Sequence, residues 1–225
     1  PTILKKRFLD RVNKNKVFGV YKINDENLDK EQDKLLNNTL KKMLPKHDLV
    51  IVSDYGHGFI SKQNANLICK LSKYLSLNAQ VNAANIGYHS MRNYKNLDCV
   101  IINKREMHHE MRDKNNKTTF LMKKFSAQQK IDNLIVTQGS DGAMMYNRKS
   151  KKFNFSKAYA KNVVDKIGAG DAMLSIVAPC LKIGFNNELS LLIGSLAGGQ
   201  SAETMGNKET TNKNHILKIL QHLLK

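Results

Sequence analysis

Three short apolar runs set the fold that this chain of 225 residues can adopt. They lie at residues 49–53, 98–103 and 134–137, and each is followed by polar residues. Continuous apolar runs of this length are typical of strands buried on both faces of a parallel sheet. Amphipathic helical patterns separate the runs, for example over residues 28–44, where Pro45 ends the pattern. This alternation predicts an α/β sandwich with a mainly parallel central sheet.

Other stretches give further expectations for secondary structure. We expect a strand at Val17–Tyr21, a helix over residues 61–77 and a short strand at residues 80–81 that leads into a polar loop. A further strand is expected over residues 158–164, where it enters a glycine turn. Helices are expected after Asp171, over residues 189–202 and over residues 215–224.

The glycine turn at residues 168–170 is the stretch with the clearest chemical meaning. Gly168 and Gly170 let the backbone pass close to a ligand, and the start of the following helix favours an anion such as phosphate. Asp171 would repel a phosphate there, unless it takes a proton from the group that attacks the phosphorus. On spacing alone, a plain connection with Asp171 as a helix cap remains an alternative.

The turn Gly168-Ala169-Gly170-Asp171, preceded by Asp165, resembles the signature of the ribokinase or PfkB family of carbohydrate kinases. The resemblance is strongest to the kinase part of bifunctional heptose-phosphate kinase/nucleotidyltransferases. It implies a ribokinase-like three-layer α/β/α sandwich and transfer of the γ-phosphate of ATP to a hydroxyl of a sugar or sugar phosphate. It also implies that Asp171 is the catalytic base and that the amides of Gly168, Ala169 and Gly170 form an anion hole.

Two further stretches resemble nucleotide-binding elements of this family. Residues 136–142 resemble a Val-Thr-x-Gly-x-x-Gly element, which implies that Thr137 and Gly139 approach the ATP phosphates and that Gly142 supports the turn. An ordinary hairpin is the alternative. Residues 203–207 resemble the terminal loop on the nucleotide side, which implies a contact from Asn207.

The Asn-x-x-Glu spacing of Asn103 and Glu106 also resembles a family motif. It implies that Asn103 lies near the nucleotide and that Glu106 places Mg²⁺, often through water, as suits a hard cation. A helix cap with a surface glutamate is the alternative. The following His108-His109-Glu110 lacks the spacing of a zinc helix and is interpreted as surface.

The residues expected to bind the acceptor sugar are predicted from weaker similarities to the family. Residues 54–58 are similar to an Asp-Tyr-Gly-Lys-Gly element of the heptose-kinase branch, which implies that Asp54 and Gly56 bind substrate; His57 stands where that branch has Lys. Asp54 as a plain turn residue is the alternative. A Val-Asn-Ala tripeptide around Asn82 replaces the Asp-Pro pair of many relatives, and we expect Asn82 and Asn85 to hydrogen-bond a sugar or phosphate.

Composition argues against several other classes of protein. The formal net charge of +18 favours phosphate-rich partners, but lysines are spread along the chain and tryptophan is absent, which argues against a specific nucleic-acid interface. There is no apolar run of membrane-spanning length and no apolar centre of a signal peptide at the start, so we expect a cytoplasmic protein with no membrane partner. Three separated cysteines, Cys69, Cys99 and Cys180, are expected as reduced core residues.

The expected organisation is a single kinase domain over residues 1–225 that lacks the usual N-terminal portion and lid of the family. Lys5 and Arg7 either contact a sugar phosphate or form a solvated edge. The resemblance leaves open a homodimer and a fused or partner nucleotidyltransferase domain. Two rival functions also stay open: a catalytically impaired nucleotide-binding module of a larger enzyme and, less favoured, a basic nucleic-acid-binding protein.

Overall fold

A six-stranded sheet forms the centre of the molecule in the computed structural model, which describes residues 3–12, 16–24, 26–80, 90–208 and 210–223. The strand order is β3-β4-β5-β6-β7-β8. Strands β3 to β6 are parallel to one another, whereas β7 is antiparallel to β6 and β8 is antiparallel to β7. The prediction of a mainly parallel sheet is therefore confirmed. The strands are β3 Val50–Asp54, β4 Leu75–Ala79, β5 Leu97–Asn103, β6 Ile131–Thr137, β7 Ala143–Asn147 and β8 Lys152–Ser156.

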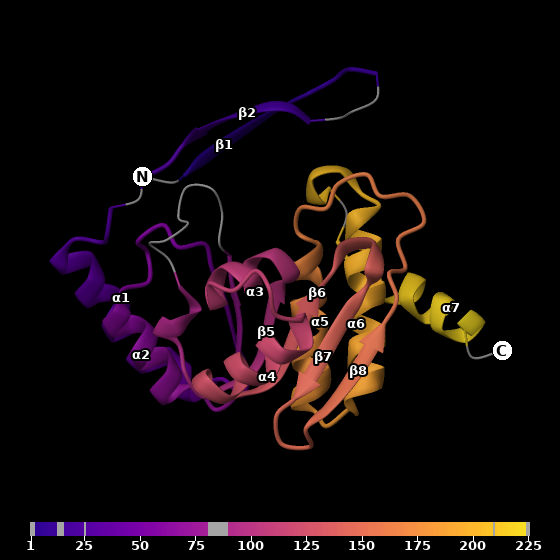
Figure 1. Cartoon of the computed structure of the whole chain (residues 1–225). Coiled ribbons are helices and arrows are strands. Elements are labelled where there is room, and N and C mark those ends of the chain that lie inside the picture. Colours follow the sequence, from indigo (N-terminus) through magenta and orange to yellow (C-terminus); the bar gives the residue numbers. More distant parts are fainter. Residues whose placement is uncertain (1–2, 13–15, 25, 81–89, 209, 224–225) are drawn as a thin grey trace.

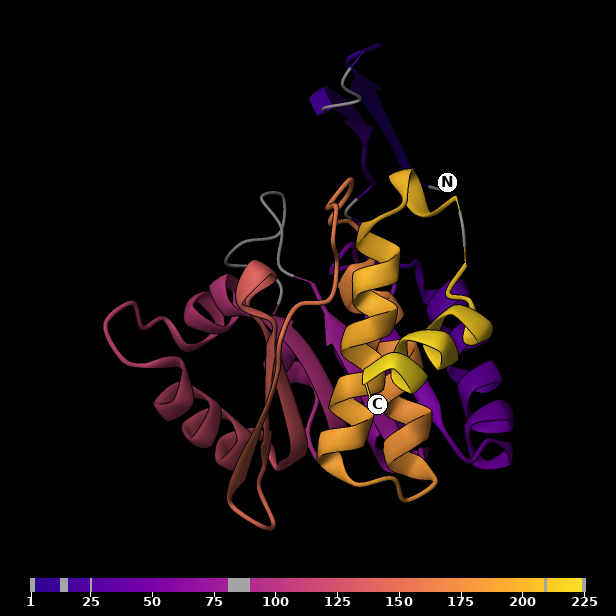
Figure 2. The same ribbon diagram turned by 90° about the vertical axis from the view of Figure 1, so that its right-hand side faces the viewer.

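Helices cover both faces of this sheet, and Figure 2 shows α3 and α4 on one side of the strands and α5 and α6 on the other. The alternation of β5 explains the layers: Val100 and Ile102 pack with the first set of helices, whereas Cys99 and Ile101 pack with the second. The helices are α1 Lys30–Met43, α2 Lys62–Leu71, α3 Lys104–Met111, α4 Thr118–Gln129, α5 Ala169–Lys182, α6 Asn187–Ala202 and α7 Lys213–Leu223. Short 3₁₀ turns are η1 Leu44–Lys46, η2 Met91–Asn93, η3 Gly139–Asp141 and η4 Met205–Asn207. Within the described ranges, none of the helices combines the length and apolar character needed to cross a bilayer.

The predicted helix over residues 61–77 is wrong in its second half. Helix α2 starts after its Ser61 cap but ends at Leu71, and β4 occupies Leu75–Ala79. Leu75, Leu77 and Ala79 point to the same side of the sheet and are almost completely buried. A burial period of two residues is typical of a strand, although Ile68, Leu71 and Leu75 also match the spacing of a helix.

The strand expected over residues 158–164 is also wrong. The described backbone from residue 157 to residue 168 has no regular secondary structure, and about half of the surface of each of Val163 and Val164 is exposed (52% and 48%). The amides of Val164 and Asp165 both donate to the carbonyl of Ala202, at 2.8 and 3.1 Å. The chain therefore enters the glycine turn as a loop that is tied to the end of α6.

Helices α5 and α6 pack closely because α6 presents a glycine to α5. A Cβ atom on Gly194 would lie 2.1 Å from Val177 Cγ2 and 3.2 Å from Met173 Cγ. Only glycine fits at this contact, which fixes the position of α5 against the sheet.

We expect Gly194→Ala to lower the free energy of unfolding by about 1–3 kcal/mol, because overpacking outweighs the gain of alanine in a helix. Thermal unfolding measures this change. Val177→Ala removes the clashing methyl group, so the double variant should lose less stability than the sum of the single changes. Simple additivity would contradict the proposed contact.

A separate ribbon of two antiparallel strands, β1 Leu4–Leu9 and β2 Lys16–Lys22, stands above the body in Figure 1. The strand expected at Val17–Tyr21 is thus confirmed. Phe8 and Phe18 stack across the ribbon with their ring centroids 4.3 Å apart. The ribbon reaches the body at Lys5, whose Nζ lies 5.5 Å from the ring centroid of Tyr55. The expected domain organisation, without the usual lid, stays a prediction.

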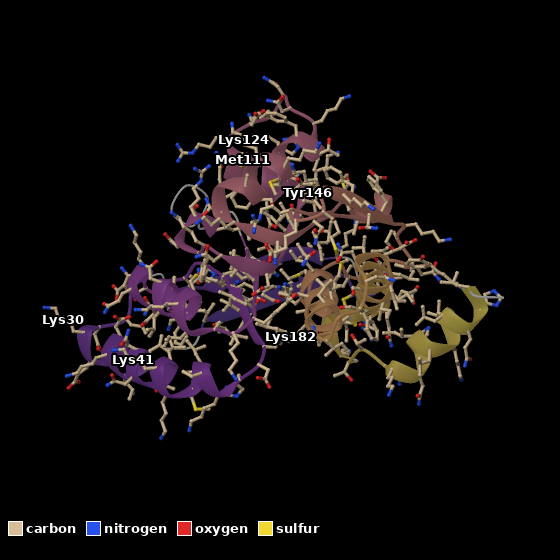
Figure 3. The ribbon with its side chains drawn as sticks, turned by 90° about the horizontal axis from the view of Figure 1, so that it is seen from below. Lys30, Lys41, Met111, Lys124, Tyr146 and Lys182 are labelled. Carbon is tan, nitrogen blue, oxygen red and sulfur yellow. The ribbon has the colours of Figure 1, made fainter. Side chains whose placement is uncertain are left out.

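Lysines occupy different parts of the surface. Viewed from below in Figure 3, Lys30 and Lys41 lie at one edge of the molecule, Lys124 lies at another, and Lys182, the last residue of α5, lies nearer the middle of the view. They come from α1, α4 and α5. The positive charge of these residues is therefore distributed around the body and is not a stripe along one helix.

Candidate active site

Asp171 is the third residue of α5 and lies beside the glycine turn. Gly168 caps the helix with φ +87°, a conformation that side chains with a Cβ rarely adopt. The first amides of a helix have no partner within the helix, and they carry the positive end of its dipole. Gly168, Ala169 and Gly170 thus place backbone donors at the start of the helix that carries Asp171.

Four side chains from the ends of two strands donate hydrogen bonds to this carboxylate. Oδ1 accepts from Asn78 Nδ2 at 2.8 Å and from Ser53 Oγ at 3.1 Å. Oδ2 accepts from Tyr55 OH at 3.2 Å and from Gln80 Nε2 at 3.5 Å. All four donors are uncharged, so these contacts orient the carboxylate through dipoles. The arrangement brings the start of α5 onto the carboxyl edge of β3 and β4.

None of these four donors was among the site residues predicted from the sequence. The signal that points to Ser53 and Tyr55 is the alternation of β3, which places them on the face opposite Asp54. For Asn78, the signal is a polar residue between Leu77 and Ala79 at the end of a buried strand. The helix expected over residues 61–77 takes in Leu75 and Leu77, and this hides the strand to which Asn78 belongs.

Asp54 lies on the other face of β3. It is 8% exposed, and its Oδ2 accepts from Tyr94 OH at 2.7 Å while its Oδ1 accepts from the amide of Gly56 at 2.9 Å. Burial, followed by the Asp54 charge and hydrogen bond, raises the pKa of Tyr94. A substrate contact from Asp54 or Gly56 stays a prediction, and Asn82 and Asn85 lie outside the described residues.

A pocket of about 490 Å³ opens on this side of β3. Asp54, Gly56 and Gly58 line it together with the start of α1 and α2, including Lys30 and Lys62. Asp171 and the glycine turn are not part of its lining. The pocket and the Asp171 cluster are therefore separate features of the same sheet edge.

Asn103 and Glu106 form a reciprocal cap at the start of α3. Asn103 Oδ1 accepts from the amide of Glu106 at 2.8 Å, and Glu106 Oε2 accepts from the amide of Asn103 at 3.0 Å. Asn103 pairs with Thr137 in the register of β5 and β6, so both predicted nucleotide-side residues lie at the carboxyl edge. The cap explains the spacing by itself, and a role toward nucleotide or Mg²⁺ stays a prediction.

The interpretation of residues 108–110 as surface is wrong for Glu110. This side chain is 7% exposed overall, accepts from Ser90 Oγ at 2.6 Å and pairs with Arg92 Nε at 3.3 Å. Helix α3 turns Glu110 toward η2, where a charge is tolerated because it is paired and hydrogen-bonded.

The element after β6 contains two glycines with different surroundings. Gly142 has φ +83°, and a Cβ there would lie 2.0 Å from the carbonyl oxygen of Ser156, so the turn requires glycine. Gly139 has φ +63°, and no atom lies within 4 Å of the place of its Cβ. Gly142 is therefore needed by the fold, whereas the predicted contacts of Gly139 and Thr137 with ATP stay predictions.

Asp165 links the glycine turn to the loop after α6. Its Oδ1 accepts from the amide of Ile167 at 3.0 Å, and its Oδ2 accepts from the amide of Gly206 at 3.2 Å. Gly206 lies in η4, next to the backbone of Asn207, whose side chain lies outside the described part of the structure. Asp165 therefore holds the predicted nucleotide-side loop near the start of α5.

In a comparison with protein families, residues 68–214 match the family described as pfkB family carbohydrate kinase. Among curated proteins, the chain is 24% identical over 223 residues to the bifunctional protein HldE of Blochmanniella floridana, which covers 98% of this chain and 44% of that protein. It is also 24% identical over 180 residues to the bifunctional protein HldE of Desulfatibacillum aliphaticivorans, covering 77% of this chain and 35% of that protein. The chain thus spans less than half the length of these relatives.

Solved structures share the fold. Ribokinase from Thermotoga maritima aligns with a TM-score of 0.74 at 17% identity, over 98% of this chain and 70% of that chain. Phosphofructokinase-2 from Escherichia coli in complex with substrates and products aligns with a TM-score of 0.71 at 15% identity, over 88% and 64%. The ribokinase-like three-layer sandwich implied by the sequence resemblance is confirmed. Because the family match covers well over half of the sequence, including the glycine turn and Asp171, this chain belongs to the pfkB family of carbohydrate kinases.

Proposed function

We propose that this chain transfers the γ-phosphoryl group of ATP to a hydroxyl group of a sugar or sugar phosphate. One observation supports the proposal most directly: the Asp171 carboxylate comes from the first turn of α5 and is oriented by donors at the ends of β3 and β4. A carboxylate at the start of a helix, next to backbone donors, combines a proton acceptor with an anion cradle. Family membership agrees with this assignment.

In the proposed reaction, Asp171 accepts the proton of the acceptor hydroxyl as its oxygen bonds to the γ-phosphorus. The bond between that phosphorus and the bridging oxygen of ADP breaks, and ADP leaves with the electron pair. The amides of Gly168, Ala169 and Gly170 donate to the oxygens of the migrating phosphoryl group. Asn78 and Ser53 keep the carboxylate oriented during the transfer.

The residues present fit a cation that arrives with ATP. In the ranges that the structure describes, no group of three or more His, Cys, Asp or Glu side chains is placed to bind a metal. Mg²⁺ suits such a setting because it keeps most of its waters and binds substrate phosphates with one or two carboxylates. Glu106 would hold it through water, and the ion would offset the charge of the phosphates. Thr137, Gly139, Asn103 and Asn207 would surround the nucleotide.

For the acceptor, we propose a seven-carbon sugar phosphate. The bifunctional HldE proteins are similar over most of this chain, and residues 54–58 resemble an element of the heptose-kinase branch. Asn82 and Asn85 would add hydrogen bonds to the sugar. We place the kinase in the cytoplasm, acting as a single domain with a fused or partner nucleotidyltransferase and compatible with a homodimer.

The test is ADP formation by the purified chain with ATP and Mg²⁺, with ribose, fructose 6-phosphate and sedoheptulose 7-phosphate as separate acceptors. The proposal predicts ADP release that depends on the sugar, with highest kcat/KM for the seven-carbon phosphate. ATP binding by calorimetry without transfer to any of the three would support an impaired nucleotide-binding module. Preference for another of these sugars would contradict only the heptose assignment.

A further inference from the structure

The phenol of Tyr55 touches the carboxylate that is proposed to act as the base. Tyr55 directly follows β3, and its OH donates to Asp171 Oδ2 at 3.2 Å. Its side chain is partly buried, and 40% of the residue is exposed. Gly56 and Gly58 follow it with φ +66° and +80°, so the chain turns sharply just after this residue.

The two oxygens of Asp171 have different surroundings. Oδ1 is held by Asn78, which is 4% exposed and donates at 2.8 Å, and by Ser53. Oδ2 is held by the exposed Tyr55 and, at 3.5 Å, by Gln80. The bonds to Oδ2 are the longer ones, and one of them comes from a side chain at the surface. Oδ2 is therefore the oxygen that an incoming hydroxyl can reach by displacing a donor.

We propose that the Tyr55 hydroxyl occupies the place of the acceptor hydroxyl on Asp171 Oδ2 until the sugar displaces it, and that it thereby keeps water away from the base. This inference rests on the proposed function, because it takes Asp171 as the base. A phenol and an alcohol present the same O–H donor to a carboxylate. The acceptor can therefore replace Tyr55 without leaving an oxygen of Asp171 unpaired.

Water is the nucleophile that this arrangement excludes. A water molecule on Oδ2 would give its proton to Asp171 while its oxygen bonds to the γ-phosphorus and ADP leaves, so that ATP is hydrolysed with no sugar phosphorylated. Kinases have to prevent this side reaction, and an enclosed site is the usual means. Tyr55 supplies a donor that fills this position on Oδ2.

The surroundings of Tyr55 keep its hydroxyl protonated and its ring in position. Burial, followed by the charge of Asp171, raises the pKa of Tyr55, so the hydroxyl stays protonated and can donate at neutral pH. Lys5 from β1 lies with Nζ 5.5 Å from the ring centroid. This cation–π contact positions the ring and links it to the β1–β2 ribbon. Displacement of Tyr55 by a sugar would therefore also release the ribbon at Lys5.

The experiment measures ATP hydrolysis without any sugar by the full chain and by Tyr55→Phe. We expect the variant to hydrolyse ATP about tenfold faster, because water can occupy the position that the hydroxyl leaves and use the base. The double variant with Asp171→Asn should lose this increase. Tyr159→Phe is a matched control, since Lys157 Nζ lies 5.4 Å from the Tyr159 ring centroid and the residue has no contact with Asp171 among those described.

Equal hydrolysis by the two proteins, including none by either, would contradict the inference, as would an increase that survives Asp171→Asn. A second readout needs no activity: the ultraviolet titration signal that Tyr55→Phe removes should move to lower pH in Asp171→Asn, and an unmoved signal would also count against it. Sugar-dependent transfer by the unmodified chain tests the proposed function separately. If that transfer occurs and is lost in Asp171→Asn, but Tyr55→Phe hydrolysis does not rise, only this inference fails.

Discussion

Asp171→Asn should retain ATP binding and lose phosphoryl transfer by about 100-fold or more. Asparagine has nearly the same shape, and its side-chain oxygen can still accept from Asn78 and Ser53, which bond Oδ1 of the carboxylate. The amide cannot take a proton from an alcohol at neutral pH. The substitution therefore removes the proposed base while leaving the glycine turn and its amides in place.

The measurements for Asp171→Asn are kcat and KM for sugar-dependent ADP release and the calorimetric Kd for ATP. Asp48→Asn is the matched control, because it removes the same charge from an exposed carboxylate that pairs with Lys73 at 3.1 Å. Its activity should equal that of the unmodified chain. Transfer within about tenfold of normal in Asp171→Asn would mean that another group accepts the proton.

The central sheet was predictable because its signal is local. The chain is apolar without interruption between Asp98 and Asn103 and again over residues 134–136, and both runs lie in buried parallel strands, β5 and β6. Hydrophobic runs of this kind need two covered faces, which only a layered α/β arrangement supplies. The same reasoning does not fix where a strand begins when a helical pattern precedes it, as at Leu75.

The site was predictable in part, and the reason lies in side-chain direction. The glycine turn and Asp171 are predictable because the motif that contains them consists of consecutive residues. Ser53, Tyr55 and Asn78 were missed because each contributes through the face of a strand that it occupies, and this face depends on register. Asp54 is predicted as a substrate ligand because it is the acidic residue of its motif, but in the structure its carboxylate accepts a hydrogen bond from Tyr94.

The loop before the glycine turn is a further place where the structure differs from the sequence prediction. Val163 and Val164 have strong strand propensity, yet they lie in a loop, where the amides of Val164 and Asp165 donate to the end of α6 and not to a neighbouring strand. Propensity is thus overridden by the tie between residues 164–165 and Ala202. The tie has a structural effect on the site, since it brings the glycine turn to the end of α6.

The second large effect is expected for Gly170→Ala, which should lower kcat/KM by about 100-fold or more, by displacing the phosphoryl group from its amides. The fold itself does not require glycine here: the nearest atom to an added Cβ is Ile101 Cγ2, at an ordinary contact distance of 3.9 Å. Alanine is also at least as favourable as glycine in a helix, so thermal unfolding should be unchanged or slightly improved. The effect is therefore expected on the ligand: a phosphoryl group held against the backbone at residue 170 would have to move to make room for the methyl group.

This combination of retained stability and lost transfer separates a ligand role of Gly170 from a packing role. Gly194→Ala gives the opposite pattern, because its Cβ clashes inside the α5–α6 contact and not in the cradle. Ser175→Ala, on an exposed position of α5, should change neither property. Nearly normal kcat/KM in a well-folded Gly170→Ala protein would place the phosphoryl group away from residue 170, because a group held against the Gly170 amide would be crowded by the added methyl group.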